Sequence, residues 1–240
     1  MSQWIAHSPG LWSQHLPEKR QLTDYKLIAF DMDSTLINIE CIDEMAGMIG
    51  LQKEVSAITE AAMRGDITDY KENLRRRVSL LKGAPISIMQ QVFDEKLQLN
   101  PGVTQLVQQC QHAGLVTLIV SGGFDYFTSK LQTLLGVTAT RSNQLEVRDG
   151  LLTGELTHQS WGDICDGEEK KRMVIQTCEA HGINADECIA VGDGSNDIPM
   201  MHWCGLSIAY QAKPKVRQQA NIAIDSGGID RMLEIITPRS

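Results

Sequence analysis

The sequence lacks the features that mark secreted and membrane-spanning proteins. Its six cysteines are scattered over 240 residues without a C-x-x-C pair, which argues against a disulfide framework and against a paired-cysteine zinc site. No apolar run reaches the roughly 20 residues that a membrane helix requires. The first ten residues lack the basic start and the apolar core of a signal peptide. We therefore expect reduced thiols, no membrane partner and a cytoplasmic location.

The sequence also lacks any block of basic residues. It carries 30 acidic and 22 basic side chains, which gives a net charge of −8. Such a chain is repelled by nucleic acid and by anionic lipid, so we expect neither as a partner. An acidic protein that acts on a phosphate must supply positive charge locally, at the site itself.

From Tyr25 onward, short apolar runs alternate with helical stretches. The runs have the length of buried strands and cover residues 26–30, 115–120, 188–191, 206–209 and 222–224. The helical stretches between them cover residues 103–112, 124–135 and 170–181, and a glycine follows each within two residues. This alternation predicts an α/β fold with a doubly wound parallel sheet.

Two segments interrupt the alternation. Residues 40–98 have no strand signal and several helical ones, which predicts a helical cap inserted after the first strand. Residues 144–156 place Asp149-Gly150 between apolar runs, which predicts a small β-hairpin. We divide the chain into an N-terminal arm (1–24), an α/β catalytic core (25–39 and 99–240) and the helical cap (40–98).

Three of the predicted strands end in polar or glycine-rich loops, at residues 31–35, 121–123 and 192–197. In an open α/β sheet, ligands bind beyond the carboxyl ends of the strands. If the three strands are neighbours, the loops meet in one crevice and bring four carboxylates together. A divalent cation would offset their repulsion, and Mg²⁺ prefers such oxygen ligands.

The residues alone leave alternatives open for each loop. Asp31 and Asp33 could act as nucleophile and as acid and base, or they could belong to a helix cap or a solvated turn. Ser121-Gly122-Gly123 could expose backbone N–H groups to an anion, or form a plain turn. Residues 192–197 could form a calcium-type loop, although the EF-hand spacing is not met.

Taken together and in order, these strings resemble the four motifs of the haloacid dehalogenase superfamily: Phe30-Asp31-Met32-Asp33-Ser34-Thr35-Leu36, Ser121-Gly122-Gly123-Phe124, Lys170, and Gly192-Asp193-Gly194-Ser195-Asn196-Asp197. The resemblance implies that Asp31 attacks phosphorus and becomes an aspartyl phosphate. It implies that Asp33 protonates the leaving hydroxyl and then activates water. Because an aspartate is ionised at pH 7, we predict that the adjacent phosphate raises the pKa of Asp33 in the substrate complex.

The resemblance also assigns the metal and phosphate contacts. Mg²⁺ would be held by Asp31, the backbone carbonyl of Asp33, and Asp193, with Asp197 acting through a metal-bound water. The remaining assigned residues bind phosphate or complete the acidic loop: Ser121, Gly122 through its N–H, Lys170 and Asn196. Mg²⁺ and Lys170 supply the positive charge that phosphoryl transfer needs.

Residues 31–46 and 74–82 are similar to the phosphoserine phosphatases of this superfamily, which implies O-phosphoserine as substrate. The resemblance assigns Glu40 to the ammonium group, Arg77 to the carboxylate, and Met63 and Tyr70 to apolar contacts. Arg77 also lies on the same helical face as Tyr70. Without the family, Glu40 would more simply cap a helix and the arginines would be solvated. Another small-molecule phosphatase or a phosphotransferase of this superfamily is the main alternative, and a non-catalytic binding protein is the other.

Overall fold

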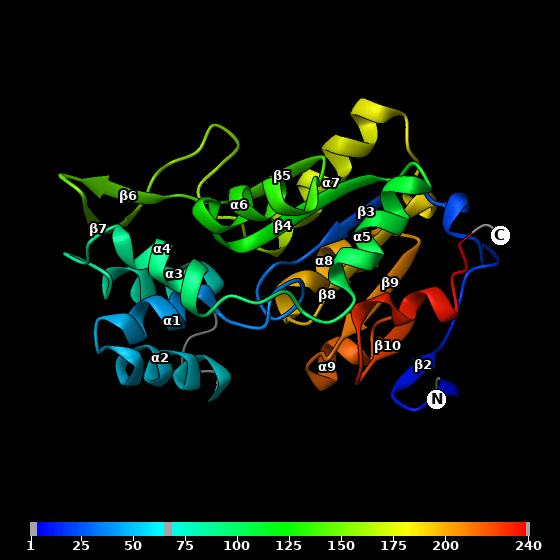
Figure 1. Cartoon of the computed structure of the whole chain (residues 1–240), viewed down its shortest axis with the longest axis horizontal. Coiled ribbons are helices and arrows are strands. Elements are labelled where there is room, and N and C mark those ends of the chain that lie inside the picture. The colour runs from blue at the N-terminus through cyan, green and yellow to red at the C-terminus, as the bar shows by residue number, and fades with distance from the viewer. Residues whose placement is uncertain (1–3, 65–68, 239–240) are drawn as a thin grey trace.

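The computed structural model describes residues 4–64 and 69–238, with the side chains of all of these except 60–64. Its main sheet has eight strands (Figure 1). The six strands of this sheet that follow the arm are parallel to one another; five of them are predicted by the sequence, and the strand at residues 139–143 is not. In spatial order the strands are β1 (Ile5–Ser8), β2 (Leu11–Ser13), β10 (Ile222–Ile224), β9 (Leu206–Tyr210), β8 (Cys188–Gly192), β3 (Leu27–Phe30), β4 (Val116–Phe124) and β5 (Ala139–Asn143).

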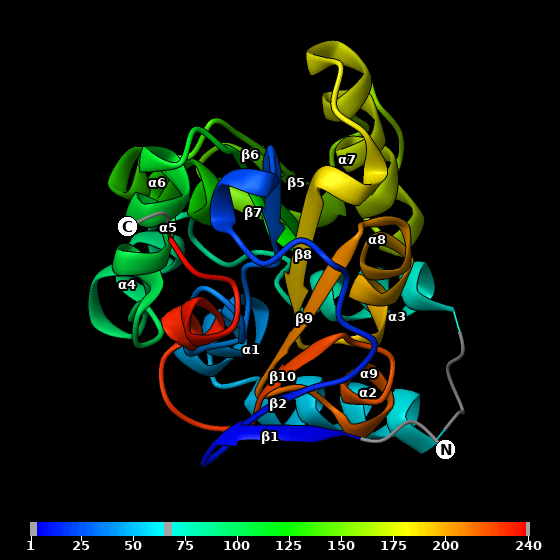
Figure 2. The same cartoon turned by 90° about the vertical axis from the view of Figure 1, so that its right-hand side faces the viewer.

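Helices cover both faces of this sheet, so the predicted doubly wound fold is confirmed (Figures 1 and 2). Strand β3 illustrates why, because successive side chains point to opposite faces. Ile28 and Phe30 pack in one apolar cluster with helices α5 (Val103–His112) and α6 (Asp125–Leu135). Leu27 and Ala29 pack in the other, with helices α7 (Gly167–His181), α8 (Ile198–Trp203) and α9 (Pro214–Arg217).

Helix α7 begins at Gly167, three residues before the predicted start. The side chain of Asp166 caps it by accepting a hydrogen bond from the backbone N–H of Glu169 (2.9 Å). Its other end is the predicted one, because Gly182 adopts a left-handed conformation (φ 65°) directly after His181. The early start places Lys170 one turn inside the helix, where it is fully buried.

Four helices lie between β3 and α5 in the chain, where the sequence predicts a helical cap: α1 (Cys41–Met48), α2 (Gln52–Arg64), α3 (Tyr70–Ser79) and α4 (Ser87–Glu95). They gather at the end of the molecule that carries the hairpin, away from both termini (Figure 1). We retain the three-part division of the chain as a proposal. None of the helices in the described residues is both long and apolar enough to span a bilayer.

The predicted hairpin is formed by β6 (Leu145–Arg148) and β7 (Leu151–Leu156). Asp149 and Gly150 both have positive φ (51° and 77°), as a tight two-residue turn requires. The hairpin packs on the cap, because the backbone of Leu152 exchanges hydrogen bonds with Gly83 and Ala84 (both 2.8 Å).

The N-terminal arm extends the sheet. Strand β2 pairs antiparallel with β10, and β1 pairs antiparallel with β2. The two tryptophans of the arm pack against Arg217, whose guanidinium lies over Trp4 (4.6 Å) and Trp12 (5.8 Å). The sequence gives no sign of these strands, because runs of three or four residues are too short to show a period.

Candidate active site

The three polar loops meet because their strands are neighbours at the centre of the sheet. Strand β3 lies between β8 and β4, with Phe30 opposite Val191 on one side and Ile119 on the other. The N–H of Asp31 continues the ladder by donating to the carbonyl of Val191 (3.0 Å). Asp31 therefore leaves the sheet at the same edge as Asp193 and Ser121, as the sequence predicts for neighbouring strands.

Lys170 is the central cation of this edge. Its Nζ donates to Oδ1 of Asp31 (2.6 Å) and to Oδ1 of Asp197 (2.7 Å), and its side chain is 0% exposed. Burial alone would lower the pKa of Lys170, but the carboxylates of Asp197 and Asp31 outweigh it and raise that pKa well above its usual value. The lysine is therefore charged, and it ties the end of β3 to the acidic loop after β8.

Asp197 is a structural anchor of that loop. Its Oδ1 accepts from Lys170, and its Oδ2 accepts from the backbone N–H groups of Asp193 (3.2 Å) and Gly194 (3.0 Å). The side chain is fully buried, and both carboxylate oxygens are occupied by these contacts. Asp197 therefore fits the expected indirect role better than direct metal ligation.

Asp31, Asp193 and Asp197 form a carboxylate cluster, in which one oxygen from each lies within 4.8 Å of the others. Burial, and then the charge of Asp197, raises the pKa of Asp31 well above its usual range and that of Asp193 to about 7. Lys170 supplies one positive charge against the three carboxylates, so a divalent cation would complete the charge compensation that this buried site needs. Among the described residues, Asp31 has one oxygen that Lys170 leaves free, and Asp193 has only a long contact with Thr35 (3.4 Å). Two free carboxylates suit Mg²⁺, which takes one or two of them together with waters and phosphate oxygens.

Asp33 lies beside this cluster on the turn that follows β3. Burial, followed by the charge of Glu40, raises the pKa of Asp33 to about 7. The pKa of Asp33 is therefore raised, as predicted, but no phosphate is needed for this. The main cause is burial rather than the charge of the substrate. The Oδ1 atom accepts from the backbone N–H of Cys41 (3.2 Å), and a Cβ at Gly123 would lie 2.6 Å from Oδ2. A carboxyl group with this pKa can both give and take a proton near neutral pH.

Ser121 and Gly122 lie within β4, which runs on to Phe124 instead of ending before them as predicted. The Ser121 hydroxyl is buried and accepts from the N–H of Gly123 (2.9 Å). The carbonyl of Gly122 accepts from the side chain of Asn143 (2.7 Å), which fixes this peptide. A Cβ at Gly122 would collide with the hydroxyl of Tyr70, so the cap lies directly against the core there.

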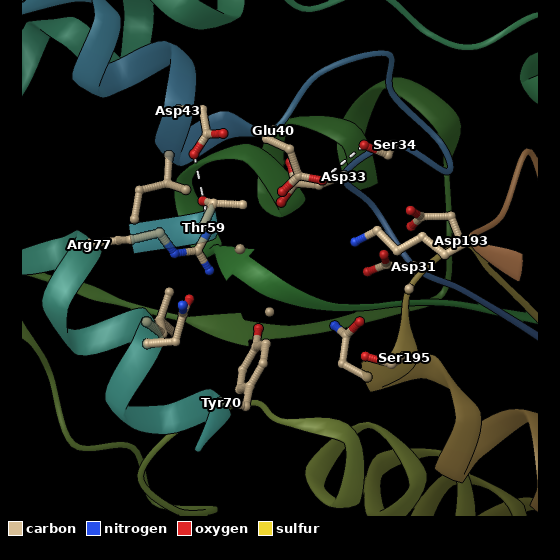
Figure 3. Close-up of a pocket in the computed structure, with 18 of the residues that line it drawn as sticks. Asp31, Asp33, Ser34, Glu40, Asp43, Thr59, Tyr70, Arg77, Asp193 and Ser195 are labelled. Carbon is tan, nitrogen blue, oxygen red and sulfur yellow. Dashed lines mark hydrogen bonds and ion pairs between the residues drawn. The ribbon is translucent and has the colours of Figure 1, made fainter. Parts of the chain in front are cut away.

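Glu40 does not cap helix α1. It occupies the N-cap position without a side-chain capping bond, and its Oε1 instead accepts from the hydroxyl of Ser34 (2.9 Å). The helix-capping alternative is therefore wrong for this side chain. Figure 3 shows Glu40 and Asp33 on the same side of the pocket.

The three consecutive arginines at residues 75–77 point in different directions from helix α3 and have different surroundings. Arg75 and Arg76 are exposed and pair with Asp163 and Glu72. Arg77 is only 14% exposed and lines the pocket with Tyr70 (Figure 3), so the solvated alternative holds for two arginines and is wrong for the third. The side chain of Met63 lies outside the described residues.

The pocket has a volume of about 730 Å³ and is bounded by both the core and the cap. Core residues Asp31, Asp33, Gly122, Asp193 and Asn196 line it at one end. Ser121 and Lys170 lie behind this wall, in contact with its residues. The cap contributes the remaining predicted residues, namely Glu40, Tyr70 and Arg77.

Asp43 and Asn73 are among the pocket residues that the sequence analysis missed. Asp43 lies on α1 with its Oδ1 4.0 Å from a guanidinium nitrogen of Arg77. Asn73 lies on α3 and is 8% exposed. Helical spacing could have found Asn73, because it is three residues after Tyr70 and four before Arg77. Asp43 has no comparable signal, since its partner lies on another helix.

Comparison with known proteins agrees with this arrangement. A family model of haloacid dehalogenase-like hydrolases matches residues 28–202. The chain is 58% identical to a phosphoserine phosphatase of Polaromonas sp. over 229 residues, which cover 95% of this chain and 97% of that one. It also resembles a solved phospho-aspartyl intermediate analogue of phosphoserine phosphatase (TM-score 0.81, 37% identity) and a substrate-bound phosphoserine phosphatase complex with the same score and identity. In both, the match covers 89% of this chain and 99% of the other.

Proposed function

Because the chain belongs to the haloacid dehalogenase-like hydrolases, we propose that it is a cytoplasmic, Mg²⁺-dependent phosphomonoesterase that hydrolyses O-phosphoserine to serine and phosphate. The observation that carries the proposal is the division of the pocket. Its core end holds Asp31, paired with the buried Lys170, and its cap end holds Glu40 and Arg77. The names of the relatives support the same substrate.

In the first half of the reaction, a carboxylate oxygen of Asp31 attacks phosphorus, and the bond from phosphorus to the serine oxygen breaks. The electron pair of that bond goes to the serine oxygen, which takes the proton of the Asp33 carboxyl group. Lys170 favours the ionised form of Asp31 and orients it through their 2.6 Å hydrogen bond. The raised pKa of Asp33 favours this step, because part of the population carries the proton near pH 7.

In the second half, water attacks the phosphorus of the aspartyl phosphate and gives a proton to the Asp33 carboxylate. The bond from phosphorus to the Asp31 oxygen breaks, which frees the carboxylate and releases phosphate. Ser121, the N–H of Gly122 and Lys170 bind the phosphoryl oxygens in both halves, and Asn196 completes the acidic loop. These donors stabilise charge on the transferring group, which is the main task in phosphoryl transfer.

The carboxylate cluster fits Mg²⁺, as its two free carboxylates and raised pKa values indicate. We assign the ion to Asp31, the backbone carbonyl of Asp33, and Asp193, with Asp197 holding the loop and acting through a metal-bound water. When bound, Mg²⁺ neutralises negative charge on the phosphoryl oxygens and on the cluster.

The cap end selects the amino acid. Glu40 pairs with the ammonium group and Arg77 with the carboxylate, because a carboxylate and a guanidinium are the partners that these charges favour. Tyr70 covers the methylene carbon that joins these groups to the phosphate, and the same role for Met63, whose side chain lies outside the described residues, stays a prediction. The cap thereby shields the bound substrate from bulk water.

A panel of phosphate esters tests the proposed function. We expect kcat/KM for O-phosphoserine to exceed that for a sugar phosphate or a nucleotide by at least about 10²-fold, because those esters leave Glu40 and Arg77 unpaired. Excess EDTA should abolish activity, and added Mg²⁺ should restore it. Equal rates across the panel would contradict the substrate, full activity in EDTA would contradict the metal, and transfer of phosphate to an added alcohol would identify a phosphotransferase.

The substitution Gly122→Ala should reduce kcat/KM for O-phosphoserine by on the order of 10²-fold. The added methyl group would collide with the Tyr70 hydroxyl and push the cap away from the core. In the Tyr70→Phe background the loss should be smaller, because the next atom of the ring lies 3.1 Å from the added carbon.

Gly47→Ala is the matched control, since its added carbon meets no atom closer than 4.0 Å. Steady-state kinetics of the four variants provide the measurement. An identical loss with Tyr70 and with Phe at position 70 would rule out this contact as the cause.

A further inference from the structure

Among the described residues, three polar atoms at the cap end of the pocket are buried without a hydrogen-bond partner. They are Oδ1 of Asp43, Nδ2 of Asn73 and Nε of Arg77, and all three residues line the same pocket. Within the described part of the chain, only two other buried side-chain atoms share this condition. An unpaired buried donor or acceptor costs free energy that a ligand can recover by forming a hydrogen bond with it. The gathering of three such atoms therefore indicates where a polar part of the ligand binds.

Asn73 and Arg77 are placed to act on one group. They are four residues apart on α3, so their side chains leave the same face of the helix on consecutive turns, about 6 Å apart along its axis. The unpaired atom of each is a donor, and two donors at this spacing suit a ligand group with two acceptor oxygens. Asn73 is 8% exposed, so its amide is held in place by the protein before any ligand binds.

Asp43 explains why Arg77 benefits from a second donor. Its carboxylate lies 4.0 Å from the guanidinium and offsets part of the charge that an anion would otherwise meet. Glu40 adds a second negative charge to the same pocket. A neutral amide contributes a hydrogen bond to an anion without requiring another counter-charge.

We propose that Asn73 is a substrate-specificity residue, whose amide donates to one oxygen of the substrate carboxylate while Arg77 donates to the other. This inference rests on the proposed function and adds a residue that the charge pattern of the sequence does not mark. It predicts that the carboxylate is recognised by a neutral donor and a cation together.

The test compares two substrates that differ by one group. O-Phosphoserine and O-phosphoethanolamine share the phosphate and the ammonium, and only the first has a carboxylate. The substitution Asn73→Leu, which keeps the approximate shape and removes the donor, should lower kcat/KM for O-phosphoserine by about 10–100-fold. For O-phosphoethanolamine the change should be less than about threefold. The loss should be found mainly in KM, because the contact is the same in the ground state and in the transition state.

Asn73→Asp provides a second variant of nearly equal size, which guards against a folding defect of the leucine variant. Its carboxylate repels that of O-phosphoserine, so the ratio between the two substrates should fall further than in Asn73→Leu. Arg77→Ala should change the ratio in the same direction, and Arg76→Ala, whose side chain is exposed and paired with Glu72, should leave it unchanged.

An unchanged ratio in both Asn73 variants would overturn the inference. Equal losses on both substrates would also overturn it, because they would place Asn73 at the ammonium or in a structural role. These results are distinct from a failure of the proposed function, which would appear first as a wild-type protein that does not hydrolyse O-phosphoserine.

Discussion

Replacement of Asp31 by asparagine should lower kcat for O-phosphoserine by on the order of 10⁴-fold or more, since an amide cannot serve as the nucleophile. The folded state should persist, because Lys170 keeps its 2.7 Å hydrogen bond to Asp197. The variant also removes one negative charge from a cluster whose burial raises the pKa of Asp31. We therefore expect a free energy of unfolding within about 1 kcal/mol of the wild-type value.

Single-turnover kinetics and urea unfolding measure the two effects separately. Asp149→Asn is the matched control, because Asp149 is exposed at the hairpin turn, and asparagine tolerates its positive φ (51°). This control should retain wild-type kcat and stability. Appreciable turnover by Asp31→Asn, in a sample shown to be free of wild-type protein, would remove Asp31 as the nucleophile.

Replacement of Lys170 by methionine should damage both stability and activity. Methionine has a similar length but leaves the buried carboxylates of Asp31 and Asp197 without their cation. Loss of one partner from a buried ion pair costs about 3–5 kcal/mol, because the remaining charges stay buried and uncompensated. Urea unfolding in metal-free buffer should show this loss, and phosphoserine hydrolysis should fall by at least about 10²-fold.

Lys171→Met is the matched control, since it changes the neighbouring residue of the same helix in the same way. The Lys171 side chain is 35% exposed, and its ion pair with Glu168 spans 3.9 Å at the surface. Such a pair contributes about 0–1 kcal/mol. A Lys170→Met variant as stable as Lys171→Met would contradict the role of Lys170 as the cation that holds β3 and the acidic loop together.

The core of the fold and the place of the site could be predicted because each rests on local patterns. Buried strands of four or five apolar residues, each followed by a polar loop, specify a parallel sheet and the edge where ligands bind. The order of the strands is not local, but the loops after β3, β4 and β8 carry chemistry only if those strands adjoin. The four motifs therefore constrained the topology as well as the function.

The remaining features depend on contacts between distant segments. The arm forms β1 and β2 only because β10 offers a free edge, which no pattern within residues 5–13 reveals. The raised pKa of Asp33 arises mainly from burial, which becomes visible only when the cap is in place. Asp43 meets Arg77 from another helix, so spacing along either helix cannot connect them. The catalytic and substrate-binding roles remain proposals that the variants above test.

The pairing of the hairpin with the cap limits how the pocket can open. The cap is joined to the core by the chain before α1 and after α4, and the hairpin adds two further connections, before β6 and after β7. Two backbone hydrogen bonds from Leu152 fasten the hairpin to the cap. An outward swing must therefore carry β6 and β7 along or break those bonds. The cap and the hairpin together are joined to the core by four chain segments, which restrict their motion more than two segments would. Substrate entry should therefore follow a limited rocking motion of the cap and the hairpin as one unit.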